Sequence, residues 1–355
     1  MSEEYFDRLV DTDRLEAYLT DTLGPANRYE LEHHQEGHSN ETIFVTWGEH
    51  ELVVRRPPPG ETAETAHDVL REYRVIDALS ATPVPVASTV SACSDHDIIG
   101  SDFYVMERLS GDVLRTTVPD RFQNDAAREA LGTELVDTLA AIHSVDPAAV
   151  GLSELGRPDG FTGRQVHRWR KQIEWARAVT ADERAVETLT DVGEWLAANV
   201  PETTPSTLVH GDYKLDNVMY GPGDDPTIVG VFDWEMSTLG DPFTDLGWML
   251  SYWWDPDDPA PPTATESLSN TFMDHPGYPT RQALIERYES ATGFTYGNDR
   301  FYRALAVYKL AALGEMFFRR YLEGNSDDPM YPRMRDGVPQ LAARAQRIID
   351  GDEPL

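Results

Sequence analysis

The stretch that decides the fold is LVHGDYKLDNVMYG, residues 208–221. It places Asp212 five residues before Asn217, on a loop between a short apolar run and a strand. A second string, IVGVFDWEMSTLGDPFTDLGWML at residues 228–250, places Asp233 at the end of an apolar strand, one hairpin later. Phosphoryl transfer needs a carboxylate that accepts a hydroxyl proton, then an amide oxygen and a second carboxylate that hold a metal. The two strings supply these parts in this order.

Length and charge exclude several other classes of protein. A chain of 355 residues, 40% of them hydrophobic, is long enough for about two domains or one two-lobed fold. It has 62 acidic and 30 basic residues, a net charge of −32, which argues against nucleic-acid and membrane partners. Cys93 is the single cysteine, and an acidic N-terminus without a long apolar run resembles no signal peptide. These features predict a cytoplasmic protein, and no obligatory protein partner is evident.

The acidic excess predicts adaptation to a salt-rich cytoplasm, where screening removes much of the self-repulsion of the chain. Only three of the 30 basic residues are lysines, namely Lys171, Lys214 and Lys309. A GC-rich genome that replaces lysine with arginine is the alternative, but codon bias does not explain doubled carboxylates.

Hydrophobic periodicity predicts a β-rich N-terminal lobe over residues 1–110 and a helical C-terminal lobe over residues 111–355. In the first lobe we expect helices at 12–23 and 62–79. We expect its strands at 42–47, 51–56, 86–92 and 102–109. In the second we expect a hairpin at 217–220 and 227–232 and helices at 124–143, 163–179, 183–199, 280–291, 299–323 and 333–349. The fold class is therefore α+β, with an antiparallel sheet and one inserted helix in the first lobe.

HGDYKLDN, followed by FDWE and GDPFTDLGWM, resembles the aminoglycoside phosphotransferase and choline kinase-like family, small-molecule relatives of the protein kinases. The resemblance implies a two-lobed protein kinase-like fold, with Asp212 as the base and Asn217 and Asp233 as Mg²⁺ ligands. It gives His210 and Asp245 a structural role in the loop. HGD in place of HRD, DWE in place of DFG and the lack of an APE segment argue against protein substrates.

Cations are scarce in this chain, so their positions are informative. Lys214 follows Asp212 by two residues, where protein kinases keep a lysine that touches the transferring phosphate. The kinase pattern also needs a cation on the third strand and a glutamate on the next helix, which Arg55 and Glu72 supply. Most of the family has lysine at this strand position. Arg56, expected to be solvated, exchanges roles with Arg55 if the register slips by one residue.

Two segments are candidates for nucleotide contacts. Residues 36–42 (EGHSNET) stand where the phosphate-covering loop belongs, and Gly37, Ser39 and Asn40 offer donors to the phosphates, although an ordinary hairpin turn fits nearly as well. Residues 103–111 (FYVMERLSG) match the hinge that binds the base. The residues there that we expect to contact the adenine are Met106, Glu107 and Leu109.

VVRRPPPG, PVPV and GRQVHRWRKQIEW resemble the branch of the family that is fused to acyl-CoA dehydrogenases in animals and phosphorylates hydroxylated acyl-CoA intermediates. Within the last string, four cations fall in two helical turns: Arg164, Arg168, Arg170 and Lys171. They fit an anionic substrate, or equally a helix paired with neighbouring carboxylates.

We therefore predict a Mg²⁺-dependent kinase that transfers the γ-phosphate of ATP, or of another nucleoside triphosphate, to a hydroxyl of a small molecule such as a hydroxyacyl-CoA-like or other anionic metabolite. One alternative is a pseudokinase or nucleotide-binding module, because arginine replaces lysine at position 55 and the phosphate loop is weak. The other is an antibiotic kinase of the aminoglycoside type. The sequence does not specify the acceptor, the choice of ATP over GTP, or the oligomeric state.

Overall fold

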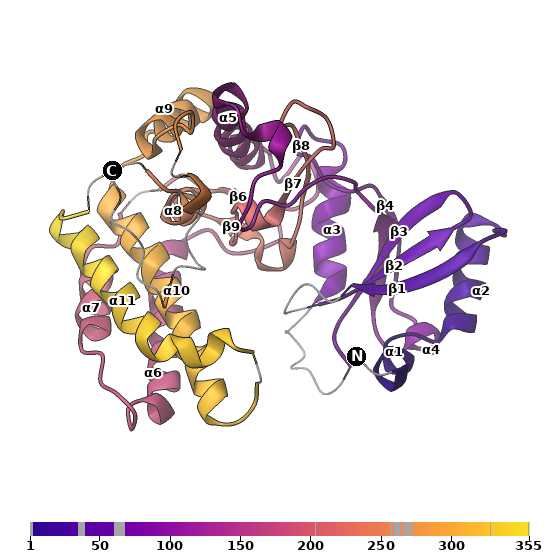
Figure 1. The fold of residues 1–355 in the computed structure, drawn as a ribbon, viewed down its shortest axis with the longest axis horizontal. Helices are drawn as coiled ribbons and strands as arrows, with labels where there is room; N and C mark the ends of the chain where they lie inside the picture. Colours follow the sequence, from indigo (N-terminus) through magenta and orange to yellow (C-terminus); the bar gives the residue numbers. More distant parts are fainter. Residues whose placement is uncertain are drawn as a thin grey trace.

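The structure is a computed structural model, and it places an antiparallel sheet on one side of the molecule and a group of helices on the other (Figure 1). The residues that it describes are 3–34, 40–59, 68–202, 204–255, 258, 264–265, 271–273, 275–326, 328–353 and 355. The strand order is β1-β2-β3-β5-β4, and every neighbouring pair is antiparallel. The strands are β1 (Tyr29–His34), β2 (Glu41–Trp47), β3 (His50–Arg56), β4 (Thr89–Cys93) and β5 (Phe103–Glu107).

The two faces of this sheet bury different hydrophobic clusters, because successive side chains of a strand point to opposite faces. Val53 and Met106, partners across β3 and β5, join the larger cluster that continues into the helical lobe. Val54 and Val105, the next pair, join a smaller cluster on the other face. Three helices contribute to that smaller cluster or lie beside it: α1 (Glu3–Leu9), α2 (Thr12–Leu23) and α4 (His96–Ile99).

Helix α3 (Val69–Leu79) lies between the sheet and the helical lobe (Figure 1). Asp68 caps it by accepting a hydrogen bond from the backbone N–H of Arg71 at 2.8 Å, which satisfies one of the free amides of the first turn. Val75 and Ile76 bury its apolar side. The predicted helix began at residue 62, but residues 60–67 lie outside the described part of the chain, so only its end at Leu79 is checked and confirmed.

The helical lobe has a small β-structured centre that carries the two strings quoted above. Strand β6 (Thr207–Val209) pairs with β9 (Thr238–Gly240), and β7 (Val218–Tyr220) pairs with β8 (Ile228–Val231), both antiparallel. Short 3₁₀ turns follow β6 and β8, namely η2 (Leu215–Asn217) and η3 (Trp234–Met236). The predicted hairpin is confirmed, whereas the pairing of β6 with β9 was not predicted, because two three-residue strands give too little periodicity.

The helices of this lobe are α5 (Asp125–His143), α6 (Phe161–Thr180), α7 (Thr188–Ala198), α8 (Phe243–Tyr252), α9 (Arg281–Thr292), α10 (Asp299–Leu322) and α11 (Met330–Asp350), with further 3₁₀ turns η1 (Asp120–Phe122) and η5 (Thr271–Met273). Helix α7 starts five residues later than predicted. Turns occupy residues 181–183, and Arg184 there is tied to the carboxylate of Glu315 at 2.7 Å rather than to a helical turn.

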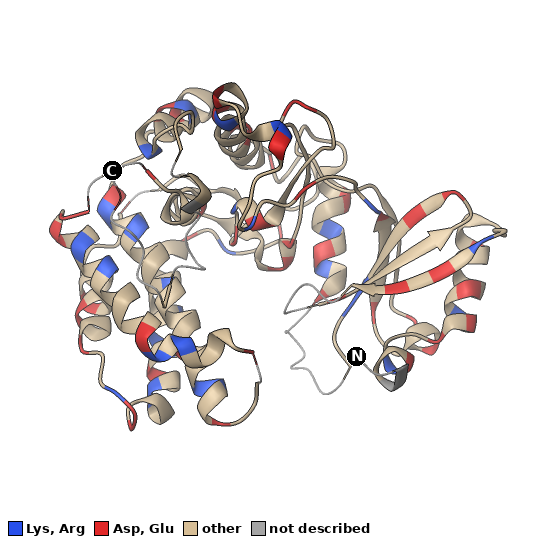
Figure 2. Ribbon diagram, in the orientation of Figure 1, with Lys and Arg blue, Asp and Glu red and all other residues tan. Residues whose placement is uncertain are grey.

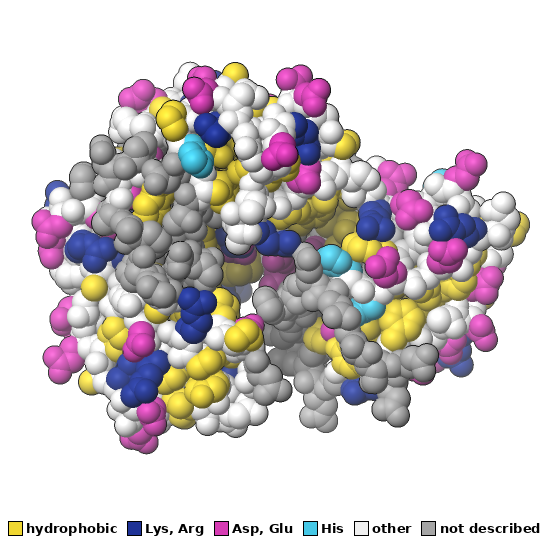
Figure 3. Space-filling model, viewed as in Figure 1, with side chains coloured by type: hydrophobic (Ala, Val, Ile, Leu, Met, Phe, Trp, Pro, Cys, Tyr) yellow, Lys and Arg dark blue, Asp and Glu magenta, His cyan; other side chains and the backbone are white. Residues whose placement is uncertain are grey.

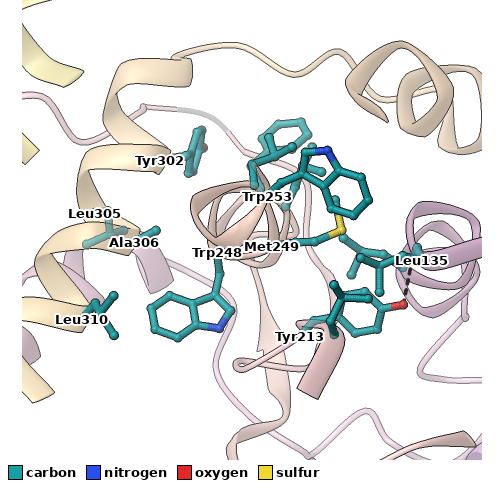
Figure 4. Packing of buried hydrophobic residues seen from close by; sticks show 14 of the residues in the cluster. Leu135, Tyr213, Trp248, Met249, Trp253, Tyr302, Leu305, Ala306 and Leu310 are labelled. Atoms are coloured by element: carbon teal, nitrogen blue, oxygen red, sulfur yellow. Dashed lines mark hydrogen bonds between the residues drawn. The ribbon is translucent and has the colours of Figure 1, made fainter. Parts of the chain in front are cut away.

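Helix α8 was not predicted, and it lies at the centre of the lobe. Figure 4 shows Trp248 on the side of α8 that faces Leu305 and Leu310 of α10, while Met249 and Trp253 lie on its other sides, toward Leu135 of α5. Both tryptophans are 2% exposed, so they belong to the core. Among the described residues, no helix is both long and apolar enough to cross a membrane.

Candidate active site

The loop between β6 and β7 carries Asp212 and Asn217. The side-chain amide of Asn217 donates to the backbone oxygen of Asp212 and to its Oδ2, both at 2.8 Å. The turn η2 makes this contact possible, because it folds five residues back on themselves. The two hydrogen bonds use the amide nitrogen of Asn217, which leaves its amide oxygen as the atom suited to a metal.

Asp245 and His210 hold the backbone of this loop. Asp245 at the start of α8 accepts hydrogen bonds from the backbone N–H groups of His210 at 2.6 Å and of Gly211 at 2.8 Å. Burial alone would raise the pKa of Asp245, but hydrogen bonding to His143 and the charge of the histidines lower it below its ordinary value. His210 Nδ1 accepts from the Asp212 N–H, so its Nε2–H donates to the Phe232 oxygen at 2.8 Å.

The hairpin brings Asp233 to the same place as Asn217. The N–H of Phe232 donates to the backbone oxygen of Asn217 at 2.8 Å, directly before Asp233. Asp233 has φ 64°, in the left-handed region, so its carboxylate is set by a backbone conformation that few residues adopt. Its Oδ1 is buried and has no hydrogen-bond partner among the described residues. Burial raises its pKa, the Glu72 charge adds to this, and Arg55 opposes it.

Arg55 on β3 pairs with Glu72 on α3, with 3.4 Å between Nη2 and Oε1. A second bond, 3.0 Å from Nη1 to Thr42 Oγ1 on β2, fixes the guanidinium plane. Burial lowers the pKa of Arg55, but the charge of Glu72, followed by Tyr104 and Asp233, raises it above its ordinary value. Arg55 therefore stays charged.

We expected Arg56 to be solvated, but this prediction is wrong: its side chain is buried, at 3% exposed. On the other face of the sheet its guanidinium donates to the backbone oxygens of Leu9 and of Ile99, the latter at 2.9 Å. Because the register Arg55↔Tyr104 is set, the exchange of roles between Arg55 and Arg56 does not occur. Arg56 instead ties the N-terminal helix α1 to the sheet.

A cleft of about 980 Å³ opens between the lobes (Figure 3). Several predicted site residues line it. The predicted phosphate-binding and metal-binding residues that line it are Arg55, Glu72, Asn217 and Asp233. The residues predicted to contact the adenine, Met106, Glu107 and Leu109, also line it, as does Asn40. Gly37 and Ser39 lie outside the described residues.

Details of the cleft refine these expectations. The Glu107 N–H already donates to the Ser88 oxygen at 2.8 Å, so only its carbonyl remains for a base. Asn40 is 6% exposed, and neither its amide nitrogen nor its amide oxygen has a described partner, so both are open to a ligand. Lys214 is not among the lining residues. Its Nζ lies 3.1 Å from Asp216 Oδ2 and 3.9 Å from Asp212 Oδ2.

The donor set fits Mg²⁺. The described residues contain no group of three or more His, Cys, Asp or Glu that would enclose a metal by themselves. Magnesium does not need one, since it keeps several waters and takes one or two carboxylates plus phosphate oxygens. The orphaned, buried Oδ1 of Asp233 and the amide oxygen of Asn217 meet that requirement. The cleft is lined by seven carboxylates and three arginines, so an anionic nucleotide entering it needs added cations.

Two cations that contact the backbone around the site were not predicted from the sequence. Lys309 on α10 donates from Nζ to the Gly211 oxygen at 2.6 Å. Arg71, next to Glu72 on α3, donates to the backbone oxygens of Leu155 at 3.0 Å and Ser237 at 2.5 Å. The scarcity of lysine, which singled out Lys214, applied equally to Lys309 in the middle of an apolar helix.

This geometry has the arrangement of a two-lobed kinase-like phosphotransferase, and comparisons with known proteins agree. The model of the phosphotransferase enzyme family matches residues 30–284. The chain therefore belongs to the phosphotransferase enzyme family. It is 34% identical over 326 residues to Acyl-CoA dehydrogenase family member 11 of Mus musculus, and 32% identical over 326 residues to that of Homo sapiens. Each match covers 89% of this chain and 40% of the relative, so the chain spans about two fifths of their length.

Solved structures agree on the fold. A crystal structure from Ralstonia eutropha, assigned as an aminoglycoside phosphotransferase, matches with a TM-score of 0.79 and 30% identity. The match covers 95% of this chain and 99% of the other. Choline kinase from Cryptosporidium parvum matches with a TM-score of 0.65 and 12% identity over 96% and 97%, a likeness of fold alone. The predicted α+β, kinase-like fold and the predicted family are confirmed. The lobe boundary at residue 110 and the roles of the individual site residues stay predictions.

Proposed function

We propose that this phosphotransferase moves the γ-phosphate of ATP, or of another nucleoside triphosphate, to a hydroxyl of a small molecule. One observation carries the proposal. The amide of Asn217 is bonded to the carboxylate of Asp212, while the backbone bond from Phe232 to Asn217 brings Asp233 to the same loop. The proposed base Asp212 is thus hydrogen-bonded to Asn217, and Asn217 is hydrogen-bonded through its backbone to the residue before Asp233.

Each of these residues then has a role in the phosphoryl transfer. Asp212 orients the acceptor hydroxyl and takes its proton, since Oδ2 is fixed by Asn217 and Oδ1 remains for the substrate. Arg55, held by Glu72 and Thr42, binds the α- and β-phosphates. Lys214, beside Asp212, neutralises part of the charge that spreads over the transferring phosphate.

Asn217 and Asp233 would hold Mg²⁺, which neutralises phosphate charge when bound. The buried, unpartnered Oδ1 of Asp233 supports this assignment. Arg55 in place of lysine demands a different phosphate geometry, because guanidinium is planar and donates in pairs.

For the acceptor, we propose a hydroxyacyl-CoA-like or other anionic metabolite. Support comes from the curated relatives, which are described as members of an acyl-CoA dehydrogenase family and match this chain over two fifths of their length. An aminoglycoside acceptor is the competing possibility within the fold.

The test is an acceptor screen by mass spectrometry with ATP and Mg²⁺ in molar KCl. We expect ADP and a phospho-ester to appear together, and Asp212→Asn to abolish both. Release of AMP would contradict phosphoryl transfer. Nucleotide binding without turnover on any acceptor would favour a nucleotide-binding module instead, and phosphorylation of aminoglycosides but not of hydroxyacyl-CoA would favour an antibiotic kinase.

A further inference from the structure

A second cavity of about 400 Å³ lies behind the loop that carries Asp212. Its lining includes the backbone of Gly211, the residue before Asp212, together with side chains of α3, α6, η3, α8 and α10. Five cations line it, namely Arg71, Arg157, Arg164, Arg168 and Lys309, against two carboxylates, Glu235 and Asp245. The nucleotide cleft, by contrast, has more than two carboxylates for each cation.

The arginines of the cavity are not held in ion pairs within the described part of the chain. None of the four arginines forms an ion pair with another residue in the described part of the chain, although acidic residues outnumber basic ones two to one. Arg71 and Arg164 are fixed by backbone oxygens instead, Arg164 by those of Arg157 and Asp159. Backbone oxygens orient a guanidinium without cancelling its charge, so the field inside the cavity stays positive.

Lys309 forms the floor of the cavity. It is 8% exposed, and it spends one of its three donors on the Gly211 oxygen. Its Nζ lies 3.8 Å from the ring centroid of Trp248, which supports a cation without removing its charge. A buried ammonium beside the ring still favours an anion as its next partner.

Asp245, the second carboxylate of the lining, offsets part of this charge, but five cations still outnumber the two carboxylates. Both oxygens of Asp245 already accept the backbone N–H groups of the loop, at 2.6 Å from His210 and 2.8 Å from Gly211. Of the four cations that the sequence places together on α6, the fold directs Arg164 and Arg168 into this cavity, whereas Arg170 and Lys171 do not line it. The cluster is therefore divided by the helix rather than acting as one patch.

We propose that this cavity binds an anionic group, a phosphate or a carboxylate, of the acceptor molecule. The inference rests on the proposed kinase function, because Gly211, which lines the cavity, belongs to the loop that carries the proposed base Asp212. An anion seated on Arg168 and Lys309 places the rest of the acceptor against the residue that precedes Asp212. Arg157 and Arg168, both exposed, are the residues free to close around it.

The test uses inorganic phosphate and acetate as probes, titrated into the full chain by calorimetry at constant ionic strength, with and without ADP. We expect saturable binding of at least one probe, unaffected by ADP. Arg168→Gln should weaken it about tenfold, because a charge-assisted hydrogen bond is lost. Arg170→Gln, which removes the same charge from the same helix outside the cavity, should leave binding unchanged. The stronger probe identifies the anionic group.

Three outcomes would overturn the inference: no saturable binding of either probe, equal binding by the Arg168→Gln variant, or loss of binding in Arg55→Gln, which would place the probe in the nucleotide cleft. Once an acceptor is found, Arg168→Gln should raise KM for that acceptor while KM for ATP stays constant. Probe binding at Arg168 in a protein without kinase turnover would defeat the proposed function and leave the anion site standing.

Discussion

The ammonium group of Lys309 lies 2.6 Å from the carbonyl oxygen of Gly211 and holds, from α10, the residue just before Asp212. Gly211 has φ 87°, and a Cβ there would meet the backbone oxygen of Met236 at 2.8 Å. The loop therefore passes through a conformation that only glycine allows, and Lys309 fixes one side of it while Asp245 fixes the other.

Replacing Lys309 with Met removes this hydrogen bond but keeps a long apolar stem. We expect kcat to fall about tenfold while KM for ATP is unchanged, because Asp212 loses its alignment and the nucleotide cleft does not change. Steady-state kinetics with varied ATP measures this, and Lys171→Met on the exposed side of α6 serves as the control. A raised KM for ATP with normal kcat would contradict the positioning role.

Asp245 should make stability depend on pH. Its folded-state pKa is below the ordinary value of 3.8, so its contribution is complete above that pH and is lost as pH falls through the folded-state pKa. Asp245→Asn should lower the free energy of unfolding by about 1–3 kcal/mol at neutral pH, and the difference should narrow in acid. Urea unfolding at several pH values tests this. Asp137→Asn, an exposed partner of Arg287, is the control and should cost less.

Asp233 should have the opposite effect on the pH dependence of stability. Burial raises its pKa, so its ionised form destabilises the folded state increasingly as pH rises from 3.8 through the raised pKa. Asp233→Asn keeps a side chain that tolerates positive φ, and we expect a higher thermal midpoint at neutral pH without Mg²⁺, together with loss of turnover. Calorimetry and ADP release measure the two effects. Full activity in this variant would refute the metal-ligand assignment.

Arg71 joins α3 to the helical lobe, and Arg71→Lys should loosen that contact. Arg71 donates to the backbone oxygens of Leu155, Glu235 and Ser237. A lysine cannot span all three, so we expect a loss of about 1–3 kcal/mol in unfolding free energy. Because Glu72 is carried by the same helix, KM for ATP should rise as well. Arg74→Lys, an exposed neighbour on α3, should change neither quantity. An unchanged KM for ATP would show that α3 is held by packing alone.

Salt should stabilise this protein. With a net charge of −32, self-repulsion acts across much of the surface, and acidic residues are spread over both lobes (Figure 2). The Debye length falls from about 10 Å at 0.1 M salt to about 3 Å at 1 M, which suppresses that repulsion. We expect both thermal midpoint and turnover to rise with KCl over this range. Best activity at low salt would overturn the prediction of a salt-rich cytoplasm without touching the kinase assignment.

Much of the fold could be predicted from the sequence, because the strongest signals are local. The strands around Val53 and Met106 are short runs rich in valine and aromatic residues. Asp212 and Asn217, five residues apart, are hydrogen-bonded to each other in the structure. Arg55 was placed correctly on the face of Glu72, but the burial of Arg56 was not foreseen, since its partners are backbone oxygens far away in the chain.

What could not be predicted depends on contacts between distant segments. The segment of helix α8 was interpreted only as part of a motif string, whereas its packing against α10 places it in the core. The second cavity likewise could not be predicted from the sequence, because its lining residues come from distant segments. Arg71 and Lys309 are 238 residues apart, yet both line this cavity.

The three acceptors of Arg71 are the carbonyl groups of Leu155, Glu235 and Ser237. Every residue type carries such a carbonyl, so the contact does not depend on which side chains occupy these positions. A change of side chain at residue 155, 235 or 237 therefore leaves an acceptor for Arg71 in place and keeps the link to α3. New acceptor preferences could evolve on this wall while the nucleotide-binding lobe keeps its alignment.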